Sequence, residues 1–202
     1  MSTLRFLSGA MSLFVAGSAA HAQSLSGDAL VKALRQGGYV IVMRHASSPR
    51  ETPTKQVANP DNMTLERQLD ETGRTTAIAM GKALRDLEIP IGDVFTSPTY
   101  RALETIRLEQ WSNPKPVPEL GDNGRSMQGG TEAQAKWLRA KVTQFPQGTN
   151  TILVTHLPNL TEAFPKLATG VEDGEALIFG PDSKGGATLV ARVGIDAWPA
   201  MH

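Results

Sequence analysis

Two histidines each lie at the end of an apolar run that is typical of a buried β-strand. Only Arg44 separates His45 from the run 39–43, and His156 directly follows the run 151–155. A neutral imidazole is a competent nucleophile near neutral pH, so a histidine at such a strand end could attack phosphorus. A single histidine in such a position is more often packed in the core than functional. Because both histidines lie at the ends of predicted strands, a shared site is favoured.

Arginines accompany both histidines in a way that suits a phosphate group. Arg44 directly precedes His45, and Arg101 follows Ser97-Pro98, a pair that predicts the beginning of a helix at Ser97. The N–H groups and dipole of a helix N-terminus favour an anion, and a guanidinium there can bind phosphate through two hydrogen bonds. Phosphoryl transfer needs such cations because negative charge is spread over three oxygens in the transition state.

Alternating apolar and amphipathic segments predict the fold that would bring these residues together. Strands are predicted at 39–43, 93–96, 151–155, 176–179 and 187–193, and helices at 26–36, 70–88 and 99–110 and from 131 and 158. This alternation predicts a three-layer α/β/α sandwich with a mostly parallel central sheet. Ligands of such sheets bind beyond the carboxyl ends of the strands, where both histidines are expected. The polar stretch 46–69 is expected to be a functional or mobile loop.

The composition indicates one soluble domain behind an export signal. The 202 residues are 40% hydrophobic and have a formal net charge of zero, so nothing indicates a surface for nucleic acid or anionic lipid. Residues 1–22 have the pattern of a cleaved signal peptide that ends in Ala20-His21-Ala22, which leaves 23–202 as the mature domain. No later segment is apolar enough for a membrane span. The chain has no cysteine, which excludes disulfides and, in an exported protein, favours the bacterial periplasm.

The motifs resemble those of the histidine phosphatase superfamily, which has the phosphoglycerate-mutase-like fold. Arg44-His45-Ala46 is similar to its Arg-His-Gly motif, and 97–105 to its Ser-Pro-x-x-Arg-Ala-x-x-Thr signature. The segment 154–156 is similar to its late histidine strand. The segment 64–74 resembles the stretch before its first long helix, and 174–198 resembles the ending of exported bacterial members.

This resemblance implies a phosphoric monoester hydrolase that needs no metal or organic cofactor. It implies that His45 is the phosphorylated nucleophile and that Arg44, Arg101 and His156 bind the phosphate. Two positions depart from the family pattern: Ala46 replaces the usual glycine, and Leu157 stands where a glycine often follows the late histidine. Alanine disfavours a positive φ, so the turn after the nucleophile could differ, and Leu157 could narrow the pocket.

Three carboxylates are candidates for the general acid. Protonation of the leaving oxygen needs a carboxylic acid with a raised pKa. Asp122 takes the place of a glutamate found in many family members and is the first choice, with Glu119 and Glu175 as alternatives. Three further arginines in or near the loops could bind the rest of a substrate or be exposed charges: Arg50, Arg67 and Arg125.

We therefore expect a periplasmic phosphomonoester phosphatase that acts on a small phosphorylated substrate through a phosphohistidine at His45. The alternative is a catalytically silent phosphate-binding or envelope-associated module on the same fold, which Ala46 and the open choice of acid motivate. A phosphohistidine-protein phosphatase is a further alternative. The export signal argues against it because such partners are cytosolic.

Overall fold

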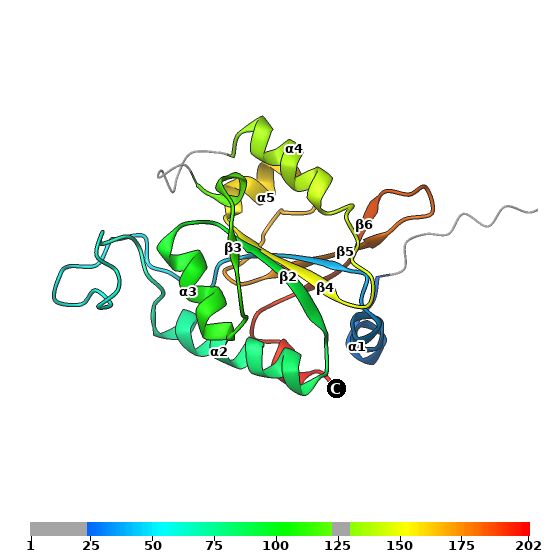
Figure 1. The fold of residues 1–202 in the computed structure, drawn as a ribbon, viewed down its shortest axis with the longest axis horizontal. Coiled ribbons are helices and arrows are strands. Elements are labelled where there is room, and N and C mark those ends of the chain that lie inside the picture. The colour runs from blue at the N-terminus through cyan, green and yellow to red at the C-terminus, as the bar shows by residue number, and fades with distance from the viewer. Residues whose placement is uncertain (1–23, 123–129) are drawn as a thin grey trace, which may run out of the picture.

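The structure is a computed structural model that describes residues 24–122 and 130–202. Within these ranges one six-stranded sheet has the order β3-β2-β4-β1-β5-β6 (Figure 1). Its strands are β1 Val40–Arg44, β2 Ile91–Thr96, β3 Lys115–Pro116, β4 Asn150–Thr155, β5 Ala176–Pro181 and β6 Ala187–Val193. The first four strands of that order run parallel, and β5 is antiparallel to both of its neighbours. The predicted mostly parallel sheet is confirmed, while the predicted signal peptide 1–22 lies outside the described residues.

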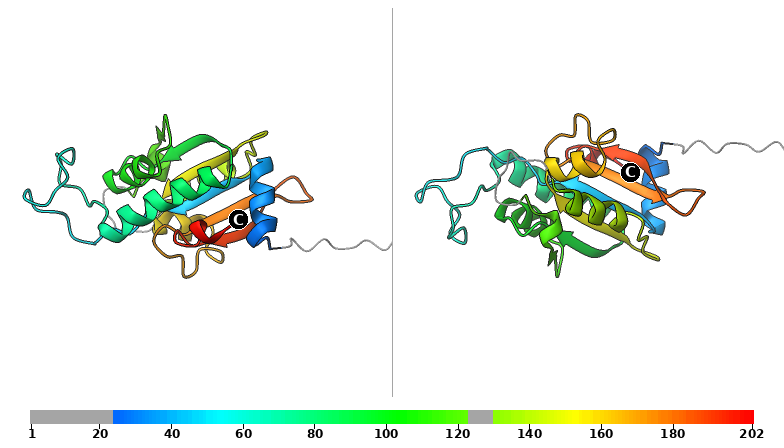
Figure 2. Two further views of the ribbon diagram at one scale, coloured as in Figure 1. Left: turned by 90° about the horizontal axis from the view of Figure 1, so that it is seen from below. Right: turned by 90° about the horizontal axis from the view of Figure 1, so that it is seen from above.

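Helices cover both faces of the sheet. Figure 1 shows α1 (Gly27–Gln36), α2 (Glu71–Asp86) and α3 (Tyr100–Glu109) on one side, and α4 (Glu132–Lys141) and α5 (Leu157–Ala163) on the other. Figure 2 shows α2 crossing the first face and α4 and α5 lying over the second. Two 3-10 helices, η1 (Pro118–Leu120) and η2 (Trp198–Ala200), complete the described elements. The predicted three-layer sandwich is confirmed, and no helix of the described part is long and apolar enough to cross a membrane.

The strands are apolar on both sides because each side chain joins one of two cores. In β1, Ile41 and Met43 pack with the first helix layer, whereas Val40 and Val42 pack with the second. This alternation explains why the sequence shows a continuous apolar run instead of a period of two. In the parallel register Arg44 pairs with the last residue of β4, so β1 and β4 end at the same level.

The beginning of α3 differs from the prediction. The N-cap is Thr99, two residues after the predicted Ser97, and Pro98 lies before the helix. The hydroxyl of Ser97 accepts a hydrogen bond from the backbone N–H of Thr99 at 3.2 Å, so it closes a short turn in place of capping the helix. By contrast, the helix predicted at 70–88 begins where it is expected, with Asp70 as the N-cap of α2, whose side chain accepts from the backbone N–H of Gly73 at 2.7 Å.

A fully buried carboxyl lies where α3 ends against α2. Glu109 is the last residue of α3, and its Oε2 accepts a hydrogen bond from Nε1 of Trp111 at 2.9 Å. Its Oε1 has no hydrogen-bond partner among the described residues. Gly81 of α2 packs so closely that a Cβ there would lie 2.3 Å from the carbonyl oxygen of Glu109. Burial raises the pKa of Glu109 to about 8, so the native protein holds this carboxyl neutral at neutral pH.

Replacing Glu109 with glutamine is expected to flatten the pH dependence of stability. Between a pKa of about 4.5 in the unfolded chain and about 8 in the native state, the native state holds an extra proton. The stabilisation from this group is complete below the window and is lost as the pH rises through it, by roughly 5 kcal/mol in all. The Gln side chain does not titrate. The free energy of unfolding of the Glu109→Gln variant, measured by urea unfolding at several pH values in this window, should therefore not show this fall.

The exposed carboxylate of Glu162 offers a matched control. Glu162→Gln should leave the slope of the native protein unchanged. A Glu109→Gln variant whose free energy of unfolding falls as steeply as that of the native protein would show that Glu109 is already ionised in the fold.

Candidate active site

The carboxyl ends of β1 and β4 bring the two histidines together. The backbone N–H of His45 donates to the carbonyl oxygen of Thr155 at 3.0 Å, which continues the strand pairing by one residue. The ring centroids of His45 and His156 lie 5.2 Å apart, with the ring planes inclined at 60°. Both side chains are buried. Residues far apart in the sequence therefore share one site, as the strand-end argument predicts.

Hydrogen bonds fix which nitrogen of His45 keeps its lone pair. Nδ1 lies 2.8 Å from the carbonyl oxygen of Ala46, an acceptor only, so Nδ1 carries the proton and donates. Nε2 keeps its lone pair and accepts from Nε of Arg101 at 3.1 Å. Burial, followed by the charges of His156 and Arg101, lowers the pKa of His45 well below its ordinary value. The imidazole is therefore neutral and presents a nucleophilic nitrogen.

The turn after His45 does not need the glycine of the family motif. Ala46 does not have a positive φ, and its methyl group is fully buried. Its backbone N–H donates to Oγ1 of Thr105 at 3.2 Å, and that hydroxyl donates to the carbonyl oxygen of Arg101 at 2.8 Å. The turn is thereby tied directly to α3. The other departure, Leu157, lies on the wall of the site cavity.

Arg101 connects the remaining side chains of the site. From the first turn of α3, its Nη2 donates to Nδ1 of His156 at 3.0 Å and forms a buried ion pair with Asp122. Because Nδ1 of His156 accepts, Nε2 carries the proton and donates to Oγ of Ser97 at 2.8 Å. Burial, followed by the charge of Arg101, lowers the pKa of His156 far below its ordinary value. Both imidazoles are therefore neutral and are held in defined tautomers.

Arg44 forms an ion pair with a carboxylate that the sequence analysis did not identify. Its Nη2 lies 2.6 Å from Oδ1 of Asp173, while its buried Nε has no hydrogen-bond partner among the described residues. The segment that carries Asp173 is fixed to the strand end, because Gly174 donates its backbone N–H to the carbonyl oxygen of His45 at 3.0 Å. No motif marks Asp173, since it lies on an irregular connection between α5 and β5.

All five predicted site residues line a single cavity of about 420 Å³. They are Arg44, His45, Arg101, Asp122 and His156, and Asp173 joins them. Tetrahedral oxyanions suit such a site, because guanidinium groups and helix N-termini are their preferred donors. Within 24–122 and 130–202, no group of three or more His, Asp or Glu side chains could hold a metal ion.

The alternative acids lie elsewhere. Glu175 binds the guanidinium of Arg192 at 2.7 and 2.9 Å and lines a neighbouring groove, which shares Arg44 and Asp173 with the site cavity. Glu119, in η1, is not among the residues that line the cavity. Of the three candidate acids, Asp122 alone lines the cavity that holds the two histidines.

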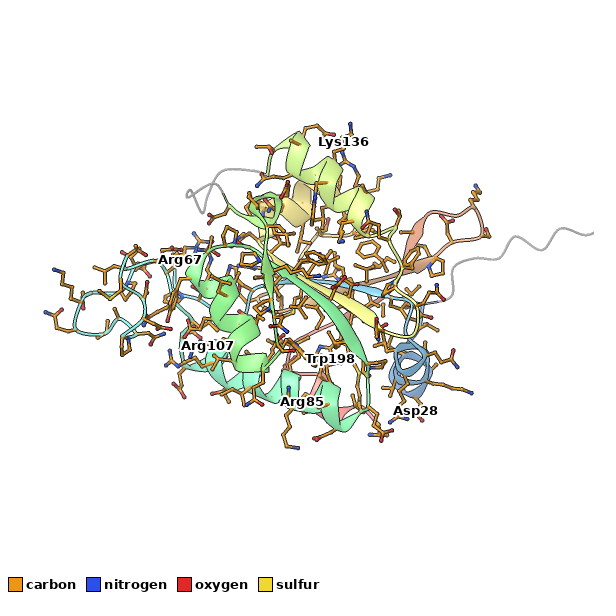
Figure 3. The ribbon with its side chains drawn as sticks, in the orientation of Figure 1. Asp28, Arg67, Arg85, Arg107, Lys136 and Trp198 are labelled. Atoms are coloured by element: carbon orange, nitrogen blue, oxygen red, sulfur yellow. The ribbon has the colours of Figure 1, made fainter. Side chains whose placement is uncertain are left out.

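Two loop arginines line the same cavity. Arg67, labelled in Figure 3, lies where the long loop meets the body of the protein, and Arg50 comes from the same loop. Arg67 is held in place because it donates to the carbonyl oxygens of Pro49 at 2.7 Å and Ser48 at 3.0 Å. Both arginines therefore add positive charge to the wall of the cavity that holds the two histidines. Arg125, the third loop arginine named from the sequence, lies outside the described residues.

Comparison with solved structures shows the same fold in several phosphatases. The protein histidine phosphatase SixA, in a complex with tungstate, has a TM-score of 0.55 and 19% identity, over 78% of this chain and 97% of that chain. A putative alpha-ribazole-5′-P phosphatase from Escherichia coli has a TM-score of 0.51 and 13% identity, over 76% and 94%. A phosphoserine phosphatase from Entamoeba histolytica, in a complex with 3-phosphoglyceric acid, has a TM-score of 0.51 and 14% identity, over 76% and 95%.

No protein-family model and no curated protein matches the chain. At identities this low, the structural similarity concerns the fold. It confirms the fold that the resemblance in the sequence implies.

Proposed function

We propose that this protein is a phosphomonoester phosphatase that works through a phosphohistidine at His45. The observation that carries the proposal is the cavity in which Nε2 of the buried His45 accepts a hydrogen bond from the guanidinium of Arg101. The arrangement pairs a neutral nucleophile with the cations that phosphoryl transfer needs. The occurrence of the same fold in structures of phosphatases supports the proposal.

The geometry supports a reaction in two displacements. In the first, Asp122 leaves its ion pair with Arg101 and takes up a proton as the phosphate binds. Nε2 of His45 then attacks phosphorus, the bond to the leaving oxygen breaks, and Asp122 gives that oxygen its proton. Arg44 and Arg101 bind the other phosphate oxygens, and His156 binds one by exchanging the hydrogen bond from its Nε2 to Ser97 for one to the phosphate. Nε of Arg44, which has no hydrogen-bond partner among the described residues, supplies a further donor. In the second, Asp122 takes a proton from water, which attacks phosphorus. The N–P bond then breaks, so inorganic phosphate and the free imidazole are released.

A substrate screen tests the proposal. The purified protein is assayed against a panel of phosphomonoesters, with the His45→Ala variant as control. Turnover that depends on His45 supports the phosphatase. Tight binding of phosphate or vanadate without any turnover would instead indicate the silent phosphate-binding module.

Asp122→Asn is expected to slow esters with poor leaving groups more than esters with good ones. The amide keeps a hydrogen-bond acceptor for Arg101 but has no proton to give. Turnover of alkyl phosphates should fall about 10²-fold or more, the usual size of a general-acid effect. Turnover of an aryl phosphate should fall by less than about tenfold, because a phenolate leaves with little help.

The matched control for this prediction is Glu119→Gln, which removes a carboxylate from the same segment outside the cavity. It should leave both classes of substrate unaffected. An Asp122→Asn variant that loses the same factor on alkyl and aryl esters would not be missing a general acid.

We propose further that residues 1–22 are removed on export and that the protein acts in the periplasm. The apolar segment before Ala20-His21-Ala22 and the absence of cysteine support this location. N-terminal sequencing of the protein from a periplasmic fraction tests it, with Gln23 as the expected first residue.

A further inference from the structure

The cavity holds two carboxylates, and the proposed reaction uses only one of them. Asp122 contacts Arg101, and Asp173 contacts Arg44, so each carboxylate forms an ion pair with one of the phosphate-binding guanidinium groups. A phosphate dianion that enters the cavity must therefore share Arg44 with Asp173. Two negative groups placed on one arginine repel each other unless one becomes neutral.

The backbone prevents Asp173 from simply moving away. The backbone N–H of Gly174 donates to the carbonyl oxygen of His45 at 3.0 Å. The backbone N–H of Arg44 donates to the carbonyl oxygen of Glu175 at 3.2 Å. These bonds hold the two residues that follow Asp173 against the end of β1. The side chain of Asp173 is also largely covered, with 31% of it exposed.

Charged groups face Asp173 from several elements. Arg44 comes from β1, Arg67 from the long loop, Asp70 from the N-cap of α2 and Arg101 from α3. Burial raises the pKa of Asp173 in spite of the nearby arginines. On its own segment, Glu172 is exposed, and Glu175 is paired with Arg192 of β6.

We propose that Asp173 is a specificity-determining residue that takes up a proton when a phosphate dianion binds, so that the site binds dianions more tightly as the pH falls. The ion pair with Arg44 is then exchanged for a phosphate contact. The protonated carboxyl changes from an acceptor to a donor toward a phosphate oxygen. This inference rests on the proposed function, because it needs the phosphate to bind at Arg44.

Calorimetry with tungstate tests the inference without turnover. Tungstate is a tetrahedral dianion that does not itself titrate near neutral pH, so any proton taken up belongs to the protein. Titrations in two buffers of different ionisation enthalpy give the number of protons bound per tungstate. The native protein should take up at least one proton per tungstate, and the dissociation constant should rise by up to about tenfold per pH unit for each proton taken up.

The Asp173→Asn variant should take up about one proton fewer than the native protein. It should also bind tungstate at least about tenfold more tightly near pH 8, because it has no charge to neutralise. Asp173→Ser, with a shorter side chain, carries the same expectation if the first variant does not fold. Glu172→Gln removes the same charge one residue away and should keep the native proton uptake.

The two proposals fail in different ways. If Asp173→Asn keeps the native proton count, the protons go to other groups, such as the two histidines or Asp122, and this inference is wrong. Turnover and the phosphorylated intermediate would be unaffected by that result. If the native protein does not bind tungstate at all, the phosphate site itself is wrong, and both proposals fall.

Discussion

Replacing His45 with alanine is expected to abolish phosphate-ester hydrolysis. The variant loses the only side chain of the proposed reaction that bonds to phosphorus. Loss of a covalent nucleophile commonly lowers kcat by about 10⁴-fold or more. Steady-state assays with an aryl phosphate measure the effect over a wide range, because such esters are the easiest to turn over.

The control for this prediction is His202→Ala, which removes an exposed histidine at the far end of the chain. It should match the native protein in turnover. Thermal unfolding of the His45→Ala variant checks that the fold persists. If this variant kept kcat within about tenfold of the native value, His45 would not be the nucleophile.

Arg101→Lys is expected to have the second largest effect. The guanidinium contacts His45 through Nε and both His156 and Asp122 through Nη2, which a single ammonium cannot reproduce. Because the lysine keeps a positive charge near Asp122, the loss of activity would come from the lost hydrogen-bond geometry more than from a lost charge. We expect kcat/KM to fall about 10³-fold, in the range found when arginines that stabilise phosphoryl transfer are removed.

Arg107→Lys provides a matched comparison on the same helix. Arg107, labelled in Figure 3, belongs to α3, and 58% of its side chain is exposed. Its ion pair with Glu104 spans 3.8 Å and contributes little at such exposure. This variant should keep native kcat/KM. Equal activities for the Arg101 and Arg107 variants would remove Arg101 from the phosphate site.

The part of the site that lies on strand ends could be predicted from the sequence. Arg44, His45 and His156 follow apolar runs, and the ends of neighbouring parallel strands meet at one edge of a sheet. Arg101 was predictable because the residues before it mark a helix beginning, even though α3 begins two residues later than expected. Local patterns carry this information because each of these residues is placed by its own element.

The remaining features depend on contacts between distant segments. Asp173 reaches Arg44 from an irregular connection, and no local pattern predicts that ion pair. The long loop is anchored by Glu104, which accepts from the backbone N–H of Leu69 at 2.8 Å and from the side chain of Asn59 at 2.7 Å. In the sequence Glu109 is an ordinary charged residue at the end of a predicted helix. Its burial depends on the close approach of α2, which no local pattern shows.

Trapping the phosphorylated protein tests the central claim most directly. The protein is mixed with a substrate that carries a labelled phosphate, denatured within the first turnovers, and divided between acid and alkali. A phosphoramidate on His45 predicts label that is lost in acid, and the His45→Ala variant should carry none. Label that survives acid would contradict the claim, because it would indicate a serine ester at a residue such as Ser47 or Ser97.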